Sequence, residues 1–507
     1  MPTDGDSDRE LELKLAVPEG AAGTVLDYPA LLLSGPDAHR KHQVTTYYDT
    51  PDHTLAHAGI ALRVRRSDGL RVQAVKADRQ AGVAADWSEW EWPITGDRPD
   101  PGLLAQTPAA GRVPEHLNLE PVAVTEIDRT TRLVHLEDGT QVEAAFDAGW
   151  IIAGDAREPV QELELELRHG HAGALYRLAL QLHATVPVTI ETAAKGARGF
   201  AMRNGTAPAP SKAVHVALTS ATGGADAFRK IMAAGLDHLL ANRNPTLAGN
   251  AEGLHQMRVA IRRLRTALRF FKPHLEKHAV ARFDAELRRI GRVFGEARDW
   301  DVFCLEILPE TLADGAAGWR EMLPEPAQER RNAAYRDAVE EIQAPAFTAL
   351  VLGLAAWAEQ GRGKAFLVGD HALHRPVAAL CPVLLDRLAD KVERRGRHIE
   401  HGSDTDRHAL RKSVKKLRYA IDYVAGAYPR EATKAYLHAC EHLQHSLGTI
   451  NDAVAATGLV ERLAEGRSDL TPALGALANI LAARRRDALE DLPKQWRHFR
   501  NEPRFWT

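Results

Sequence analysis

Charged residues alternate with leucines near the start of the sequence, at a spacing that could build a site for phosphate chemistry. Glu10, Glu12 and Lys14 occupy every second position of ELELKL, and leucines fill the positions between them. Because successive side chains of a strand point to opposite faces, this segment predicts one charged face and one apolar face. Carboxylates bind divalent metal ions and ammonium groups bind phosphate oxygens, so the pattern suits metal-assisted phosphate chemistry.

The same alternation recurs farther along, and there the charges segregate by sign. Acidic residues alternate at Glu89 and Glu91 and again at 162–166, whereas Arg63 and Arg65 alternate with apolar residues. One such strand alone would indicate only a solvent-exposed face. Clustered carboxylates repel unless they share a cation, and clustered cations repel unless they share an anion. We therefore expect a closed barrel with its charged face inward, binding a polyanion and a divalent metal.

In their order along the chain, these residues resemble the CYTH domain of the triphosphate tunnel metalloenzymes. The resemblance opens with Glu10-x-Glu12-x-Lys14 and covers about residues 8–203. It continues through LRVRR at 62–66, Lys76, Glu89-x-Glu91, Arg129, Asp147, ELELEL at 162–167 and Lys195. It implies an eight-stranded antiparallel β-barrel tunnel with flanking helices, whose lumen holds a triphosphate. Family members hydrolyse inorganic, thiamine or nucleoside triphosphates, or cyclise ATP.

The resemblance also implies roles for the charged residues. Phosphate oxygens would be bound by Lys14, Arg63, Arg65, Lys76, Arg129, Arg132 and Lys195. One or two ions of Mg²⁺ or Mn²⁺ would be held by Glu10, Glu12, Glu89, Glu91, Asp147, Glu162 and Glu164. Trp87 and Ser88 stand where family members often carry an arginine, which puts one phosphate contact in doubt. As alternatives, Asp147 could cap a turn and Lys195 could be a solvated loop lysine.

The second part of the sequence has a helical pattern. The segment NGTAPAPSKA at 204–213 lacks periodicity, which predicts a linker at about 204–219. From about 224 onward apolar residues recur with the period of an α-helix. The sequence therefore predicts an α+β multidomain protein in which the barrel is followed by an all-α helical bundle at 220–507.

This helical part contains an internal repeat. The segment that begins HQMRVAIRRLR at His255 matches the segment HALRKSVKKLR at His408, an offset of 153 residues. The same offset pairs FGEARD with LGTIND farther on. A register held over this length predicts a duplicated helical unit, with copies at about 224–365 and 370–500.

Each copy carries a stripe of basic side chains on one helix face. The candidates are His255, Arg258, Arg262, Arg265 and Arg269, then His408, Arg411, Lys412, Lys415, Lys416 and Arg418. A single stripe could be merely solvated, and each histidine could be a core or capping residue. Two matched stripes without acidic partners favour a polyanion, and the scarcity of stacking aromatics disfavours nucleic acid. The pattern resembles the CHAD domain, a helical family associated with binding inorganic polyphosphate.

The composition of the chain excludes several classes of protein. The chain has 507 residues, and 65 Lys and Arg nearly balance 68 Asp and Glu, so only local clusters can attract a polyanion. Cys304, Cys381 and Cys440 are too scattered for a disulfide framework or a zinc cluster. The longest apolar stretch, 346–358, is short for a membrane span, and the polar start indicates no secretory signal. We expect a cytoplasmic protein, and association with polyphosphate granules stays open.

The combined prediction is metal-dependent hydrolysis of inorganic triphosphate in the tunnel, with polyphosphate bound by the helical domain. The expected partners are triphosphate and polyphosphate, with no specific nucleic acid and no membrane. One alternative is a polyphosphate-binding or granule-associated scaffold with little catalysis. The other is a nucleotide or thiamine triphosphatase or a class IV-type adenylate cyclase.

Overall fold

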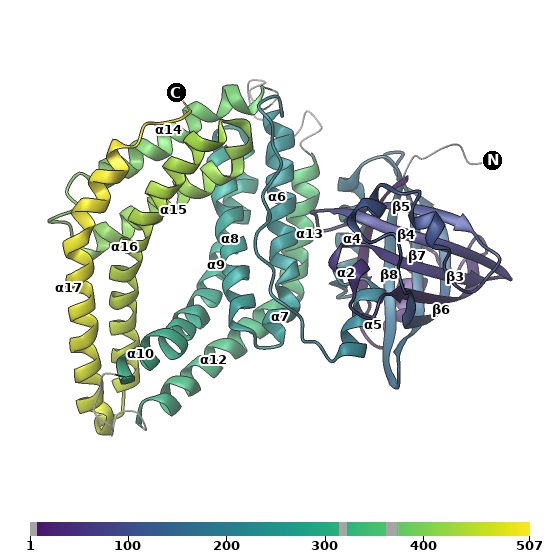
Figure 1. Ribbon diagram of the computed structural model, residues 1–507, viewed down its shortest axis with the longest axis horizontal. Coiled ribbons are helices and arrows are strands. Elements are labelled where there is room, and N and C mark those ends of the chain that lie inside the picture. Colours follow the sequence, from purple (N-terminus) through teal and green to yellow (C-terminus); the bar gives the residue numbers. More distant parts are fainter. Residues whose placement is uncertain (1–7, 314–321, 361–372, 374, 507) are drawn as a thin grey trace. The chain divides into compact units, whose positions relative to one another are not determined.

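The computed structural model describes residues 8–313, 322–360, 373 and 375–506 (Figure 1). Contacts between Cα atoms divide the chain into two compact units. The first unit comprises residues 1–209 with 344–360, and the second comprises 210–343 with 361–507. The predicted boundary between the two helical repeats, near 365–370, lies outside the described residues.

The first unit is built on a closed antiparallel barrel. Its eight main strands are β1 (Asp8–Ala16), β2 (His39–Asp49), β3 (Ala61–Ser67), β4 (Leu70–Gln80), β5 (Ala85–Pro93), β6 (Glu120–His135), β7 (Gln141–Ala153) and β8 (Ala156–His169). They are hydrogen-bonded in the order β5-β4-β3-β2-β6-β7-β8-β1, and β1 also pairs with β5. A two-residue strand, β9 (Thr189–Ile190), adds to β1. The predicted eight-stranded antiparallel barrel is confirmed.

Strand β1 closes the barrel because its two halves pair with different neighbours. Residues 8–12 pair with β5, and residues 12–16 pair with β8. The tight β3–β4 hairpin helps to set the register, since only Asp68 and Gly69 separate the paired residues Ser67 and Leu70. Both turn residues have positive φ, at 51° and 78°, as a two-residue type I′ turn requires.

The apolar face of the barrel points outward and is covered by helices. One side of the barrel packs under α2 (Thr54–His57), α3 (Pro101–Leu104) and the short 3-10 turn η1 (Pro108–Arg112), which share an apolar cluster with β3 and β4. The helices α1 (Ala22–Leu26), α4 (Ala172–His183) and α5 (Lys195–Asn204) complete the unit. With the apolar face covered from outside, the charged face lines the lumen.

Helix α13 (Pro345–Glu359) belongs to the barrel unit although it lies in the sequence range of the helical domain. It runs antiparallel to α4, since His183 Nε2 lies 2.9 Å from the carbonyl oxygen of Pro345. At the other end of α4, a Cβ atom on Gly173 would lie 3.3 Å from the Cβ atom of Glu359. The chain therefore passes between the two units three times.

A chain that ends at residue 209 should be markedly less stable than the complete barrel unit. It lacks α13, whose Phe347, Val351 and Leu354 are at most 1% exposed. Each buried side chain of this kind contributes about 1.5–3 kcal/mol. We expect an unfolding midpoint at least about 10 °C lower than that of residues 1–209 joined to 344–360 by a long Gly-Ser linker. Equal midpoints by circular dichroism would contradict the assignment of α13 to the barrel.

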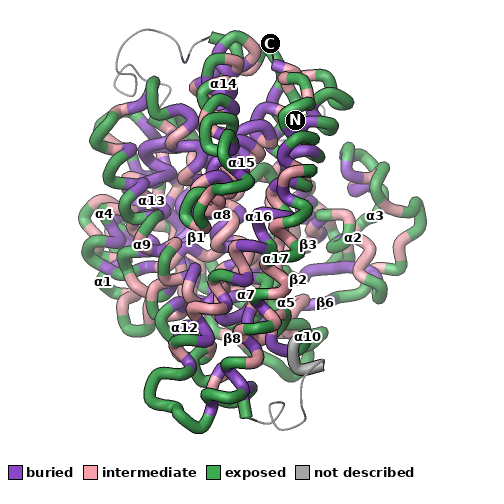
Figure 2. The backbone as a smooth tube through the Cα atoms, turned by 90° about the vertical axis from the view of Figure 1, so that its left-hand side faces the viewer, coloured by how far each residue is buried: buried purple, intermediate pink, exposed green. Residues whose placement is uncertain are grey.

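The second unit begins with a segment without helix at 210–223 and is built from helices in the rest of the part that the structure describes. Its helices are α6 (Gly224–Ala241), α7 (Arg243–Leu247), α8 (Ala251–Phe271), η2 (Lys272–His274), α9 (Lys277–Val302), η3 (Phe303–Ile307), α10 (Leu308–Ala313), α12 (Pro324–Gln343), α14 (Val377–Gly396), α15 (Asp404–Val424), η7 (Ala425–Ala427), α16 (Arg430–Ala464), η8 (Ser468–Leu470) and α17 (Thr471–Asn501). Along these helices, buried and exposed residues alternate with the helical period (Figure 2).

The internal repeat is visible in the helix boundaries. Helices α8 and α15 begin and end 153 residues apart, and so do the short turns η2 and η7. The starts of α9 and α16 are separated by the same 153 residues. The sequence repeat therefore corresponds to a repeated helix–turn–helix unit, in which α8 with α9 is the first copy and α15 with α16 is the second.

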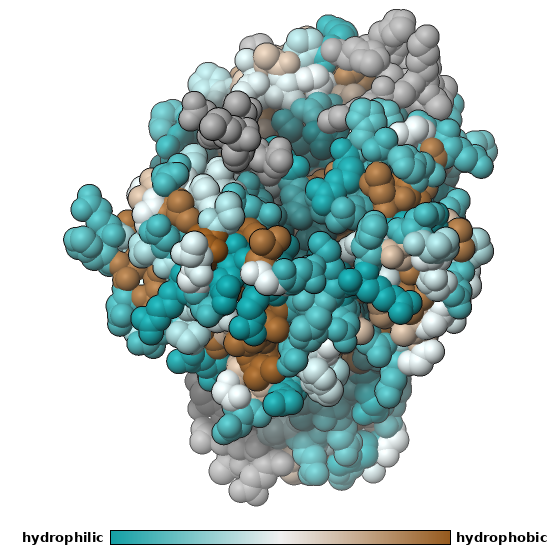
Figure 3. All heavy atoms as spheres, turned by 90° about the vertical axis from the view of Figure 1, so that its right-hand side faces the viewer, coloured by the Kyte–Doolittle hydropathy of each residue, from teal (hydrophilic) through white to brown (hydrophobic). Residues whose placement is uncertain are grey.

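The surface is mostly polar. One face in space-filling view shows hydrophilic side chains with hydrophobic ones scattered among them (Figure 3). Large exposed apolar side chains such as Leu70 and Val383 belong to separate elements. Among the described residues, no single helix is both long and apolar enough to cross a membrane, although the bent pair α12 and α13 passes that test by length and composition.

Candidate active site

The barrel lumen contains a cavity of about 1010 Å³. Twelve of the residues predicted to bind phosphate or metal line it: Lys14, Arg63, Arg65, Lys76, Arg129, Lys195, Glu10, Glu12, Glu89, Glu91, Asp147 and Glu164. Strand alternation explains the arrangement on β8, where Glu162, Glu164 and Glu166 point inward while Leu163 and Leu165 are fully buried under the outer helices.

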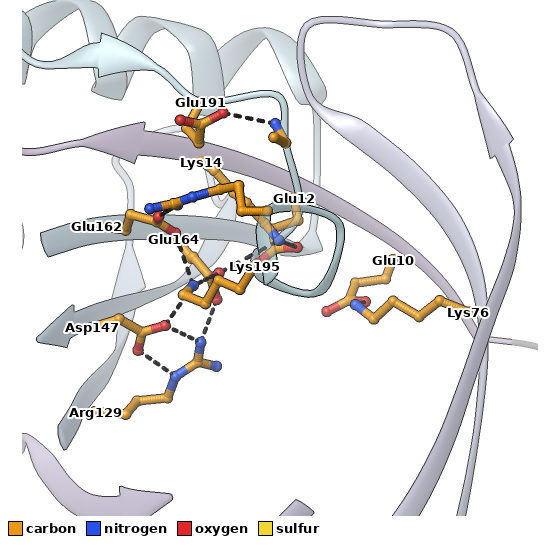
Figure 4. Close-up of polar contacts among 12 residues, drawn as sticks. Glu10, Glu12, Lys14, Lys76, Arg129, Asp147, Glu162, Glu164, Glu191 and Lys195 are labelled. Atoms are coloured by element: carbon orange, nitrogen blue, oxygen red, sulfur yellow. Dashed lines mark hydrogen bonds and ion pairs between the residues drawn. The ribbon is translucent and has the colours of Figure 1, made fainter. Parts of the chain in front are cut away.

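A network of ion pairs crosses one side of the lumen (Figure 4). The Lys195 Nζ atom lies 2.9 Å from Asp147, 2.9 Å from Glu162 and 2.6 Å from Glu164. Arg129 donates two hydrogen bonds of 2.6 Å to the Asp147 carboxylate and also pairs with Glu164. Burial alone would lower the pKa of Lys195, but these carboxylates raise it well above its usual range. Both cations are therefore fixed in the charged state.

The position of Lys195 depends on the close approach of α5 to the barrel. A Cβ atom on Gly196 would lie 2.6 Å from the Tyr47 ring, and one on Gly199 would lie 2.3 Å from Ala123. Only glycine fits at these contacts, so the segment KGARG lets the helix start directly over the lumen. Lys195 is therefore a buried lumen residue and not a solvated loop lysine. Asp147 lies within β7, paired with Arg129 across the ladder, and does not cap a turn.

A second group of charged side chains surrounds Glu89. Two members of this group, Glu10 and Lys76, are shown in Figure 4. Arg63 Nη2 lies 2.7 Å from Glu89, and Lys76 Nζ lies 3.1 Å from Glu89 and also contacts Glu10. Burial raises the pKa of Glu10 to about 7, although Lys76 opposes the shift, and the neighbouring Glu89 and Glu12 carboxyls add to it. A further cation bound beside Glu10 would stabilise the ionised form of this carboxyl group.

The basic stripes of the helical unit form a separate site. Arg258 is 3.0 Å from Asp299, and its repeat equivalent Arg411 is 3.6 Å from Asp452. Burial, together with Arg262 and Arg411, lowers the pKa of Lys415 to about 6. Cations from α8 and α15 therefore crowd one place, and among the described residues no carboxylate lies within 4 Å of Lys415. This basic cluster, made of Arg258, Arg262, Arg411 and Lys415, would be stabilised by a bound polyanion, because the anion would offset the repulsion that lowers the pKa of Lys415.

Two protein-family models match successive parts of the chain. Residues 8–199 match the model of the CYTH domain, and residues 230–461 match the model of the CHAD domain. The chain is a CYTH domain followed by a CHAD domain.

Individual relatives support the two domains separately. An inorganic triphosphatase from Haemophilus influenzae is 30% identical over 204 residues, which are 38% of this chain and 54% of that protein. The chain thus spans about half the length of this curated relative. The crystal structure of the CHAD domain from the plant Ricinus communis is 27% identical and covers 59% of this chain and 98% of its own, with a TM-score of 0.52.

The remaining candidates of the CYTH barrel lie outside the cavity lining. Arg132 was predicted to bind phosphate in the tunnel, and this placement is wrong. It falls out of step with Thr125 and Arg129, so it points to the outer face of β6, toward the carbonyl oxygens of Leu31 and Leu32 at 3.3 and 3.4 Å. Glu162 points inward but is 2% exposed beneath Lys195 and Arg198.

Sequence reasoning missed several lumen residues of the CYTH barrel. The cavity is also lined by Arg9, Tyr47, Trp87, Glu143, Glu166 and Arg168. Glu166 continues the ELELEL alternation onto the inward face, but the predicted metal ligands on this strand ended at Glu164. Burial and the nearby Glu10 raise the pKa of Glu166 to about 8, while Arg168 opposes the shift.

The lumen carboxylates fit a divalent metal ion, although within the described ranges no three potential ligands already surround one point. Glu12 and Glu166 are direct cross-strand partners on β1 and β8. Glu10 lies on the same face of β1 two residues away, and its carboxyl raises the pKa of Glu166. All donors are oxygens, as Mg²⁺ and Mn²⁺ prefer. Glu10, Glu12 and Glu166 would hold such an ion.

In the CHAD domain, the predicted stripe residues do not all converge. Arg265 and Arg269 both donate to Asp284, at 2.9 and 3.0 Å, so one carboxylate holds both guanidinium groups and offsets part of their charge. His255 has its pKa lowered to about 4 by burial and by Arg298. Burial also lowers the pKa of His408, although its Nδ1 contacts the Asn451 side chain. Both histidines are therefore neutral at pH 7.

The last three stripe residues lie around the second copy of the repeat. Lys412 is exposed, and burial with nearby Arg269 lowers the pKa of Lys416 to about 8. The Arg418 guanidinium stacks on the Tyr419 ring at 4.8 Å, and Arg262 approaches the same ring at 5.8 Å. Arg263 lies 5.7 Å from this ring as well, so Tyr419 contacts cations from both α8 and α15.

Proposed function

We propose that the CYTH barrel hydrolyses inorganic triphosphate with the help of Mg²⁺ or Mn²⁺. The observation that carries this proposal is the lumen cavity, in which eight cationic side chains stand among carboxylates. A triphosphate is a short chain of anionic oxygens without an apolar part, so a lumen lined by charges can contact most of its surface. The inorganic triphosphatase from Haemophilus influenzae supports the same substrate.

For hydrolysis of a triphosphate, the protein must mainly position the substrate and stabilise its negative charge. Water attacks the terminal phosphorus, the P–O bond to the bridging oxygen breaks, and phosphate and pyrophosphate leave. Arg63, Arg129 and Lys195 are already charged and partly buried, so they can bind phosphate oxygens without a large rearrangement. A metal held by Glu10, Glu12 and Glu166 would neutralise substrate charge and acidify a bound water.

We propose inorganic polyphosphate as the ligand of the CHAD domain. The basic cluster brings cations from both repeat copies together, and Asp299 and Asp452 each offset only one arginine. Polyphosphate has closely spaced charges and no bases, which suits a site with arginines and a lysine but few aromatic rings. We also propose that the protein is cytoplasmic and meets polyphosphate there, which fractionation with labelled granules would test.

Turnover of tripolyphosphate should depend strictly on a divalent metal. Excess chelator is expected to remove activity, and Mg²⁺ or Mn²⁺ should restore it, because substrate charge must be neutralised at the carboxylate side of the lumen. The assay is phosphate release, with ATP, thiamine triphosphate and long-chain polyphosphate measured in parallel. Undiminished turnover in chelator would refute the mechanism. Binding without turnover of any substrate would favour the scaffold alternative.

A nucleoside triphosphate is the second candidate substrate, because Trp87 lines the cavity. An indole ring at this point can stack on a base, and inorganic triphosphate has none. Faster turnover of ATP than of tripolyphosphate, abolished in Trp87→Ala, would favour this candidate.

Replacing Arg63 and Arg65 together by lysine should raise KM for tripolyphosphate at least about 10-fold. A guanidinium offers a planar fork to two phosphate oxygens, whereas an ammonium offers a single point of charge. Steady-state kinetics would test this, with Arg71→Lys, a half-buried arginine of β4 that does not line the cavity, as the control. Unchanged KM and kcat in the double variant would mean that neither side chain contacts the substrate.

A further inference from the structure

Helices α16 and α17 carry a group of exposed histidines that neither proposed site uses. His438 and His442 are one helical turn apart on α16, and His498 lies on α17. All three side chains are exposed. The equivalent positions in the first repeat copy are Ala285 and Arg289, so this group is not part of the duplicated polyanion site.

The two α16 rings already stand as a pair of metal ligands would. Their Nε2 atoms are 2.9 Å apart, and the ring centroids are 4.3 Å apart at an interplanar angle of 87°. With metal–nitrogen bonds of about 2.0–2.1 Å, this separation corresponds to a ligand–metal–ligand angle of about 90°. That angle suits square-planar or octahedral ions such as Cu²⁺ and Ni²⁺ better than tetrahedral Zn²⁺.

A third imidazole, that of His498, lies near the pair on the neighbouring helix α17. The His498 ring centroid is 6.4 Å from that of His442. Within the described residues no three such side chains already surround one point, so His498 must turn toward the pair to complete the site. It can do so because its side chain is exposed. The nearby Glu441 is held by Arg418 at 3.8 Å and is not needed as a ligand.

We propose that His438, His442 and His498 bind one divalent transition-metal ion of the class that prefers imidazole, with Cu²⁺ or Ni²⁺ favoured over Zn²⁺. Each neutral ring keeps one proton, so binding at both Nε2 atoms of the α16 pair places those protons on Nδ1. The bound ion bridges α16 and α17 and adds a cross-link between two long helices. This site differs in chemistry from the oxygen-lined lumen of the barrel.

The test is a metal titration of the full-length chain without an affinity tag, after treatment with chelator. Excess Mg²⁺ is kept in the buffer, since it occupies carboxylate sites and does not compete for imidazole. Calorimetry with Cu²⁺ and Ni²⁺ is expected to show one tight site per chain. The spectrum of the bound Cu²⁺ should report nitrogen ligands, and metal should raise the unfolding temperature.

Alanine variants separate the three ligands. His438→Ala and His442→Ala should each weaken binding at least about 10-fold, and His498→Ala should reduce both affinity and thermal stabilisation. His278→Ala removes an exposed histidine of α9 and should behave as the wild type. Absence of a tight site in the wild type, or unchanged affinity in either α16 variant, overturns the proposal. Unchanged affinity and stabilisation in His498→Ala overturns the bridge between helices.

Discussion

Glu12→Gln is expected to lower turnover of tripolyphosphate at least about 100-fold while the barrel stays folded. Glu12 lies where β1 changes partners, opposite Glu166 on one side and Ala85 on the other. Its carboxylate is 2.9 Å from Lys14 Nζ and is among the groups that would hold the metal. A neutral amide of the same shape keeps the packing but removes a charge from a preorganised site, and such losses are about 100-fold or larger.

The matched control is Glu126→Gln, which changes an exposed glutamate on the outer side of the same barrel. It should keep wild-type kinetics. Circular dichroism and thermal melting establish that both variants are folded, and metal titration of the chelator-treated proteins should show weaker binding in Glu12→Gln only. Wild-type turnover in a folded Glu12→Gln protein would mean that this carboxylate does not hold the metal.

Reversing two charges of the basic cluster should weaken polyphosphate binding at least about 100-fold. Arg258→Glu with Arg262→Glu removes two charge-assisted contacts, each of which contributes about 1.5–3 kcal/mol. It also places two carboxylates beside Arg411 and Lys415. The affinity of the wild type should fall steeply with salt, because binding releases counterions, and this dependence should be shallower in the variant. Titration of labelled long-chain polyphosphate at several salt concentrations measures both effects.

The control for this double variant is a second pair of basic residues, four positions apart on a helix, that has no structural role. Arg430→Glu with Lys434→Glu meets this need, since both are exposed and stand four residues apart on α16. Arg331 would be unsuitable, because it lies 2.7 Å from the fully buried Asp301. Any affinity of the barrel for polyphosphate is common to both double variants. Equal loss in the two pairs, or displacement of polyphosphate by DNA at equal charge, would assign the basic cluster another partner.

Periodicity in the sequence was sufficient to predict the two faces of the strands and the helical repeat, whereas the eight-stranded barrel was predicted from the resemblance to the CYTH family. A period of two puts Glu10, Glu12 and Lys14 on one face of β1 whatever the tertiary structure, and closure of the sheet then turns them inward. The offset of 153 residues survives in the helix ends because cap and turn positions are local properties. Asp68 and Gly69 likewise specify their hairpin without any distant contact.

Other features depended on contacts between segments far apart in the sequence. Arg132 is an odd step from Arg129, which already predicts the outer face of β6, but only the structure shows its contacts with the carbonyl oxygens of Leu31 and Leu32. Lys195 reaches Glu164 because two glycines let α5 lie close to the barrel. No pattern within either segment contains this information.

The sequence by itself determined which residues are charged, their order and the face of each strand on which they stand, because these follow from local periodicity. Only the tertiary structure decided which charges meet. In the folded chain, α13 packs against α4 in the barrel unit. Asp284 forms ion pairs with Arg265 and Arg269, whereas Lys415 lies among other cations. The physical reason is that ion pairing and burial depend on distance in space, and segments separated by tens of residues come together only when the chain packs its apolar faces.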